Sequence, residues 1–259
     1  MTYTDILPKK FDAIEEKHHI ISWIRGYFKD NGPDCKAIIG ISGGKDSTIA
    51  AALCVEALGR DRVIGVMMPN GEQSDIDDSV AIIKALGIKS YCINIEKTVN
   101  ALYETLEWNS VIPGANIMTN APARVRMTVL YAVAANEHGR VCNTCNRSED
   151  FVGYSTKFGD AAGDFSPLSS YTVAELLAIG KTLDIDEKFI FKTPSDGMCG
   201  KSDEDNLGFT YLELDNFLLN GHEPREDKLK RINELHKRNI HKIKPMPHCS
   251  TAYGSSYWF

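Results

Sequence analysis

The chain has 259 residues, of which 43% are hydrophobic and 25% are charged, and its formal net charge is −6 at pH 7. This length is enough to bury one sizeable α/β core. The acidic balance argues against a nucleic-acid partner, which needs clustered Lys and Arg. No run approaches the about 18 apolar residues of a membrane span, and the charged N-terminus does not resemble a secretory signal. We therefore expect a cytoplasmic protein without membrane association.

Predicted strands and helices alternate along the first half of the chain. Apolar residues at helical spacing predict a first helix from Phe11 to Phe28. Strands that alternate with helices and are almost wholly apolar indicate a doubly wound α/β fold, a parallel sheet with helices on both faces. No repeat or linker interrupts the pattern, so we expect residues 1–259 to form a single domain. The predicted strands are Lys36–Ile41, Val63–Met68, Ser90–Ile95 and Arg140–Asn143, and the predicted helices between the first three are Ser47–Leu58 and Ser74–Leu86.

The segment from Ser42 to Ser47, Ser-Gly-Gly-Lys-Asp-Ser, lies between the first predicted strand and the next helix. At such a turn, backbone N–H groups and the helix dipole converge on phosphate. A Walker A loop is excluded, because Gly40 is one residue too close to the Gly-Lys pair and Asp46 replaces the magnesium-binding hydroxyl. An ordinary helix cap would need only one Ser, Asp or Gly, and not the whole run from Ser42 to Ser47. The motif therefore predicts a nucleotide site at the carboxyl end of a strand.

A second cluster begins at Asn116. Pro122 suits a first helical turn with Asn120 as its cap, which would place Arg124 and Arg126 near a helix N-terminus. Two cations there oppose the helix dipole and indicate a nearby anion. Solvation of the two arginines, or pairing with acidic neighbours, explains them equally well.

A third cluster follows the last predicted strand, over residues 143–168. It holds carboxylates, a lysine, hydroxyls and glycines without helix or strand periodicity. A loop of this length usually has a function, and a merely solvated connection would not explain its aromatic residues. We expect this loop to contribute to the site.

Taken together, these segments resemble the NAD synthetase family of the ammonia-dependent bacterial type, within the ATP pyrophosphatase superfamily. The resemblance covers nearly the whole chain, and its strength lies in the order and spacing of motifs that would be weak alone. The matching segments are Ser42–Ser47, Ala123–Met127, Thr144–Pro167, Thr193–Ser195, Ser202–Glu204 and His241–Lys242.

The resemblance implies an enzyme that joins deamido-NAD to ammonia with cleavage of ATP to AMP and pyrophosphate, the last step of NAD biosynthesis. It further implies a homodimer with two dinucleotide sites at the subunit interface, and Mg²⁺ as the cofactor. The length leaves no room for a glutamine amidase domain. The implied residues are Gly40, Ile41, Ser42, Gly43, Gly44, Lys45, Asp46, Ser47, Thr144 and Ser195 for ATP, Asp46 and Glu149 for Mg²⁺, Arg124, Lys157, Asp164, His241 and Lys242 for deamido-NAD, and Lys45, Asp46, Lys157 and Lys201 for catalysis.

One position departs from the family pattern. A lysine that reaches the ATP phosphates commonly follows the Asp…Pro segment, but this chain has Val173 there. We hypothesise that Lys45, or Lys201 in the polar segment 195–206, supplies the missing charge. That segment has the composition of a mobile lid or, equally, of a solvated connection.

Two alternatives remain at the level of sequence. Another ATP pyrophosphatase, such as a GMP synthetase module or a tRNA-thiolating enzyme, would share the loop but should carry an amidotransferase domain or a basic surface with paired C-x-x-C motifs. A non-catalytic adenine-nucleotide sensor would not need Glu149, Lys157 and Asp164 together.

Overall fold

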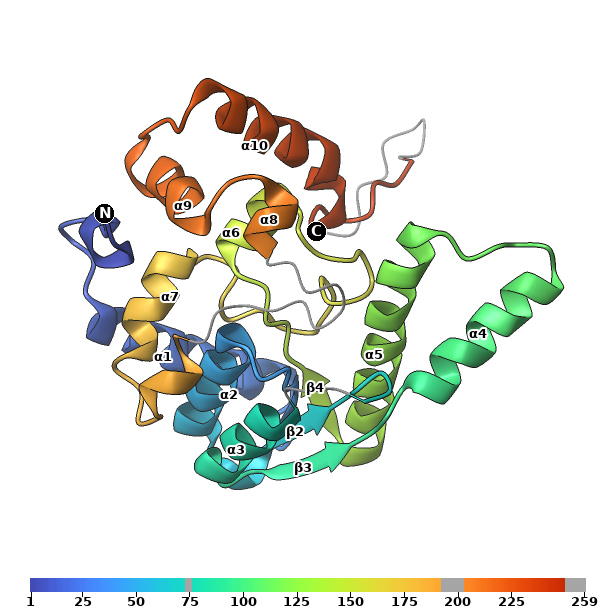
Figure 1. Ribbon diagram of the computed structural model, residues 1–259. Helices are drawn as coiled ribbons and strands as arrows, with labels where there is room; N and C mark the ends of the chain where they lie inside the picture. The colour runs from blue at the N-terminus through green and yellow to red at the C-terminus, as the bar shows by residue number, and fades with distance from the viewer. Residues whose placement is uncertain (73–75, 192–202, 250–259) are drawn as a thin grey trace.

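The structure, a computed structural model, describes residues 1–72, 76–191 and 203–249. The strands among these residues form one parallel sheet in the order β3-β2-β1-β4 (Figure 1). With helices on both faces, this sheet confirms the predicted α/β class. The strands are β1 (Lys36–Gly40), β2 (Val63–Met67), β3 (Lys89–Cys92) and β4 (Gly139–Val141), within a few residues of the predicted ranges.

Helices connect and follow the strands, and the described ones are listed here in chain order. They are η1 (Tyr3–Ile6), α1 (Ala13–Asn31), α2 (Lys45–Leu58), η2 (Arg60–Arg62), α3 (Ile76–Leu86), α4 (Glu96–Trp108), α5 (Ala115–Glu137), α6 (Arg147–Val152), α7 (Val173–Gly180), η3 (Glu187–Phe189), α8 (Asp203–Leu207), α9 (Tyr211–Asn220), α10 (Glu226–Asn239) and η4 (Ile240–Lys242).

The inner strands β1 and β2 are buried on both faces, and alternate residues of each point to opposite sides of the sheet. On β1, Ile39 belongs to the large core formed with α1, α2, α3 and α7. Its neighbour Ile38 belongs to a smaller core with Met127 and Leu130 of α5. Both strand residues are fully buried, which explains the apolar sequences of β1 and β2, whereas the edge strand β3 is polar and largely exposed.

The helix α5 starts earlier than predicted. It begins at Ala115 with Gly114 as its N-cap, so Pro122 lies inside it and Asn120 is not a cap. Proline lacks the N–H that would bond the Met118 carbonyl one turn back. The Tyr103 hydroxyl donates to that carbonyl at 3.4 Å instead. A partner from α4 thus makes the interior proline tolerable, which local sequence could not indicate.

The segment after β4 is less irregular than predicted. It contains the six-residue helix α6, whose capping box joins Asn146 and Glu149, and an isolated parallel bridge between Cys142 and Phe165. These features hold the segment at the carboxyl end of β4, beside the end of β1.

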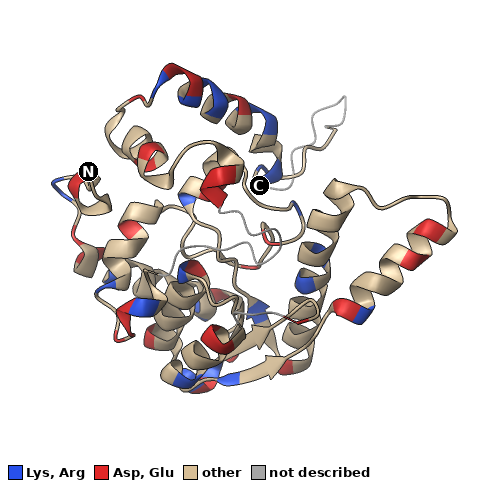
Figure 2. Cartoon of the chain, in the orientation of Figure 1, with Lys and Arg blue, Asp and Glu red and all other residues tan. Residues whose placement is uncertain are grey.

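Helices of the C-terminal region pack over this segment. The helix α10 lies on α6, and α9 contacts both α6 and α7 (Figure 1). Acidic and basic residues are interspersed along α10, whose last turn is basic (Figure 2). Within the described ranges, no helix combines the length and apolar character needed to cross a membrane.

Candidate functional site

The loop between β1 and α2 has the geometry of an anion site. Gly43 adopts φ of 83°, a conformation that favours glycine, and Gly44 is the N-cap of α2. The hydroxyls of Ser42 and Ser47 lie 3.2 Å apart, and the Gly44 N–H donates to Ser42 Oγ at 3.3 Å. The loop follows Gly40 and Ile41 directly. It therefore presents hydroxyls and backbone amides at the N-terminus of α2, where an anion can bind.

Lys45 and Asp46 form a buried ion pair at the first turn of α2. The Lys45 Nζ lies 2.8 Å from Asp46 Oδ2, and the Lys45 side chain is only 7% exposed. Burial alone would lower the pKa of Lys45, but the negative charges of Asp46 and Glu149 outweigh it and the pKa is raised. The ammonium is thus a fixed positive charge beside the phosphate loop.

Asn146 connects the two carboxylates of the site. Its Nδ2 donates to Asp46 Oδ1 at 3.2 Å, while its Oδ1 accepts from the Glu149 N–H at 3.0 Å. The Glu149 carboxylate accepts in turn from the Asn146 N–H at 3.1 Å. Burial and the charge of Asp46 raise the pKa of Glu149. Two carboxylates from different elements are held close enough to repel each other.

This donor set fits a divalent cation. With both carboxylates ionised, the ammonium and the two carboxylates carry a net charge of −1, and this buried excess of negative charge is costly unless a cation joins it. Magnesium commonly takes one or two protein carboxylates and completes its shell with water and phosphate. Among the residues that the structure describes, no group of three or more His, Cys, Asp or Glu gathers as a self-sufficient metal site. The pair would therefore need phosphate oxygens to complete the shell.

Thr144 lies in the turn that leaves β4, two residues before Asn146. The preceding residue, Asn143, fixes that turn: its Oδ1 accepts from the Cys145 N–H at 2.9 Å and its Nδ2 donates to the Asp160 carbonyl at 2.8 Å. The structure thus brings Thr144 to the same sheet edge as the Ser42 loop.

A second cluster of cations gathers at the end of α10. Lys157 Nζ donates to the His241 carbonyl at 2.9 Å, and the Arg124 guanidinium donates to the Lys157 carbonyl at 3.2 Å. Lys242 Nζ donates to the carbonyls of Gly153 and Ser155 at 2.7 and 2.9 Å. Four of the five residues expected to bind the dinucleotide therefore lie together.

The arginines of α5 do not lie at a helix N-terminus, so the dipole argument for them is wrong. Arg124 and Arg126 are in the middle of α5, because the helix begins at Ala115. Arg126 Nε donates to the Met68 carbonyl at 3.0 Å, and burial lowers its pKa. It joins α5 to the chain that leaves β2, whereas Arg124 stays exposed beside Lys157.

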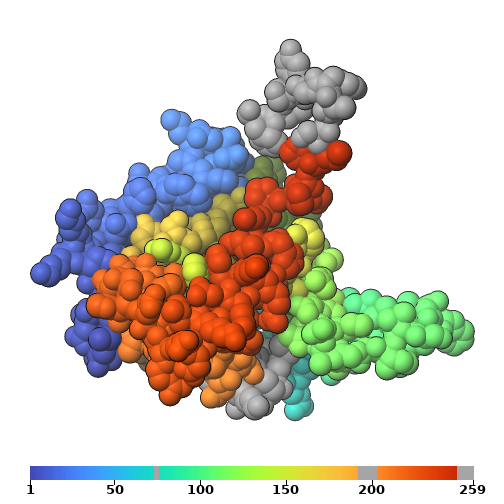
Figure 3. Space-filling view, turned by 90° about the horizontal axis from the view of Figure 1, so that it is seen from above, coloured from blue at the N-terminus to red at the C-terminus, as the bar shows by residue number. Residues whose placement is uncertain are grey.

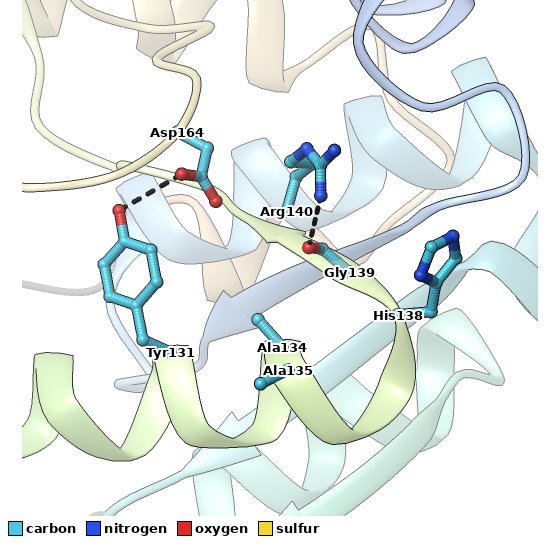
Figure 4. A pocket seen from close by; sticks show the side chains of 7 residues that line it. All are labelled: Tyr131, Ala134, Ala135, His138, Gly139, Arg140 and Asp164. Atoms are coloured by element: carbon cyan, nitrogen blue, oxygen red, sulfur yellow. Dashed lines mark hydrogen bonds between the residues drawn. The ribbon is translucent and has the colours of Figure 1, made fainter.

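Asp164 lies apart from the four clustered residues. Its carboxylate accepts from the Val141 N–H at 2.7 Å and from the Tyr131 hydroxyl at 3.3 Å. Asp164 lines an open pocket of about 320 Å³ between α5 and β4 (Figure 4). The other lining residues are Ala134, Ala135, His138, Gly139 and Arg140.

Two of the expected site residues, Ser195 and Lys201, lie outside the described residues, as does most of the segment 195–206. Asn146, in contrast, was not singled out from the sequence although it holds both carboxylates. The signal was present, because Asn146 and Glu149 have the spacing of a capping box.

The chain is similar to known proteins in sequence and in structure. A family model described as "NAD synthase" matches residues 16–251. The "NH(3)-dependent NAD(+) synthetase" of Pyrococcus horikoshii is 37% identical over 238 residues, which cover 86% of this chain and 91% of the relative.

Two solved structures share the fold. One is described as "NMN synthetase from Francisella tularensis", with a TM-score of 0.85 and 34% identity over 93% of this chain and all of that one. The other, an "NH3-dependent NAD synthetase" from Campylobacter jejuni in complex with nitrate, has a TM-score of 0.75 and 26% identity over the same shares.

Proposed function

The chain belongs to the NAD synthase family, and on that premise we propose that it catalyses the ATP-dependent amidation of deamido-NAD by ammonia. A carboxylate resists ammonia because its charge repels nucleophiles and oxide leaves poorly. The nicotinate carboxylate oxygen therefore attacks the α-phosphorus of ATP, and pyrophosphate leaves. Ammonia then attacks the carbonyl carbon of the acyl adenylate, and AMP leaves with the bridging oxygen.

The observation that carries this proposal is the buried Lys45–Asp46–Asn146–Glu149 cluster beside the Ser42 loop. Hydroxyls and amides of the loop bind the departing pyrophosphate, and Thr144 and Ser195 complete the ATP site. Asp46 and Glu149 would hold Mg²⁺, which when bound stabilises the negative charge that develops on the phosphates. Preorganised charges of this kind act without a covalent protein intermediate.

Lys45 supplies the cation that the family pattern has at position 173. Val173 has no charged group, and it is 2% exposed and packs in the core. Lys45 is fixed at the phosphate loop by Asp46. Its buried, charged side chain supports Lys45 as the substitute.

On the acceptor side, Arg124, Lys157, His241 and Lys242 bind the dinucleotide phosphates and sugars. The cationic groups of Arg124, Lys157 and Lys242 donate to backbone carbonyls, which are neutral acceptors, so their positive charge can act on an anionic ligand. Lys242 also lies near the Asp160 carboxylate. Asp164 would bind the same substrate from the pocket between α5 and β4.

We further propose that the chain is a homodimer joined through α4 and the start of α5. These elements stand out from the body as an arm (Figure 3). Trp108 at the end of α4 is 91% exposed, and Ile112 in the following turn is 76% exposed. Apolar side chains gathered on a projecting element are typical of an interface.

Product analysis tests the proposal. Purified protein with ATP, Mg²⁺, ammonium and deamido-NAD should form NAD, AMP and pyrophosphate in equal amounts. ATP cleavage without NAD would indicate another ATP pyrophosphatase activity, and no cleavage would favour a nucleotide sensor.

A second acceptor belongs in the same assay, because one structural neighbour is named for NMN. Nicotinic acid mononucleotide presents the same carboxylate on a smaller molecule. If kcat/KM is higher for the mononucleotide than for deamido-NAD, the proposed dinucleotide substrate is wrong and the amidation chemistry stands.

A further inference from the structure

Tyr211, the first residue of α9, has a buried hydroxyl that no part of the proposed site uses. The residue is 2% exposed, and within the described part of the chain its hydroxyl finds no hydrogen-bond partner. Buried polar groups are nearly always paired, and one left unpaired bears its full desolvation penalty. Such a group calls for an explanation.

The ring of Tyr211 lies against the phosphate site. The Lys45 ammonium is 5.8 Å from the ring centroid, within the range of a cation–π contact. That ammonium also bonds to Asp46, so Tyr211 and Asp46 contact the same cation from different elements. The helix α9 thereby reaches the loop that follows β1.

The position of Tyr211 is fixed by its own helix start. Thr210 caps α9 through a capping box with Glu213. The Tyr211 N–H donates to Glu204 Oε1 of α8 at 2.8 Å. The backbone is therefore anchored at the start of α9, and the burial of the ring leaves the hydroxyl little freedom to seek another partner.

The surroundings also define the kind of partner that the hydroxyl needs. A tyrosine phenol keeps its proton at neutral pH, so the Tyr211 hydroxyl can donate a hydrogen bond. A group that enters beside Lys45 and offers acceptor oxygens would satisfy it. Phosphate has this chemistry.

We propose that the Tyr211 hydroxyl binds ATP by donating a hydrogen bond to a phosphate oxygen, while its ring supports the Lys45 ammonium. This inference rests on the proposed function, since it needs ATP in the Ser42–Ser47 loop. It adds a nucleotide ligand from α9 to those of the β1 and β4 loops.

The test compares Tyr211→Phe with the unaltered protein by thermal unfolding and by ATP titration with Mg²⁺ but no acceptor. Phe keeps the ring under Lys45 and removes only the unpaired hydroxyl. Without nucleotide, the variant should therefore unfold at the same or a higher temperature. Its affinity for ATP should fall about 10- to 100-fold, as expected for a lost hydrogen bond to a charged group.

Tyr171→Phe is the matched control. The Tyr171 hydroxyl donates to Glu16 at 2.6 Å, so its loss should lower the unfolding temperature and leave the ATP affinity unchanged. If Tyr211→Phe binds ATP as tightly as the unaltered protein, or unfolds at a lower temperature without nucleotide, the inference is wrong. If the unaltered protein itself does not bind ATP, the proposed function fails first and takes this inference with it.

Discussion

At the residue scale, the site depends on Asn146 as much as on the charged residues that it holds. One amide side chain donates to Asp46 and caps the helix that carries Glu149. The two carboxylates come from segments about 100 positions apart in the chain, as the span of the Asn146–Asp46 bond indicates. Asn146, a neutral residue that can bond to both carboxylates, therefore sets the distance between Asp46 and Glu149.

We predict that Asn146→Ala weakens the binding of Mg²⁺ and lowers kcat/KM. Groups that orient metal ligands typically contribute about 10- to 100-fold in metal affinity or activity. The lost cap should also destabilise the protein by about 1 kcal/mol. The Mg²⁺ dependence of the rate, together with thermal unfolding, measures both effects.

Asp12→Ala separates these effects. Asp12 caps α1 with hydrogen bonds to Ile14 and Glu15, and α1 contributes no residue to the proposed site, so the loss of this cap should affect stability alone. An Asn146→Ala enzyme with unchanged Mg²⁺ dependence would show that Asn146 only caps α6.

At the element scale, α5 is joined to the sheet by a carboxylate at its last residue. Glu137 accepts from Lys36 of β1 at 2.8 Å, from Lys89 of β3 at 2.7 Å, and from the Tyr91 hydroxyl. These hydrogen bonds, first among them the one from Lys36, lower the pKa of Glu137 to about 2. One side chain thus connects the edge strand β3 and the inner strand β1 to α5.

The depressed pKa predicts a pH-dependent effect of Glu137→Gln. An unfolded Glu titrates near its ordinary value of 4.5, so the stabilisation is complete above that pH and is lost as the pH falls toward about 2. The variant should unfold at a lower temperature than the unaltered protein at pH 7, and the difference should shrink below pH 4.5. A difference that stays constant from pH 7 to pH 3 would exclude this role.

At the scale of the whole molecule, the projecting arm of α4 predicts the oligomeric state. Trp108→Glu should weaken the proposed dimer by about 30-fold or more, because a central interface aromatic commonly contributes at least about 2 kcal/mol. Analytical ultracentrifugation over a concentration series measures the dissociation constant of the dimer. Ile14→Glu, at an exposed apolar residue of α1, is the control and should leave the dimer intact. An unaltered protein that sediments as a monomer would refute the dimer.

Local sequence patterns were sufficient to predict the sheet and the Ser42 loop, because buried strands and a glycine-rich turn depend on residues close together in the sequence. The family resemblance is confirmed by the matching model and relatives. The start of α5 was mispredicted because a hydroxyl from another helix makes Pro122 tolerable. Tyr211 could not be found, because its unpaired hydroxyl and its contact with Lys45 exist only after α9 has packed. The roles assigned to the individual site residues stay predictions.

The most direct test of the account follows an oxygen atom. Deamido-NAD labelled with a heavy oxygen isotope in its nicotinate carboxylate is incubated with the protein, ATP, Mg²⁺ and ammonium, and the products are examined by mass spectrometry. If the carboxylate attacks the α-phosphorus, one labelled oxygen appears in AMP for each NAD formed. Label in inorganic phosphate with release of ADP, or NAD formation with no label in AMP, would contradict adenylylation at this site.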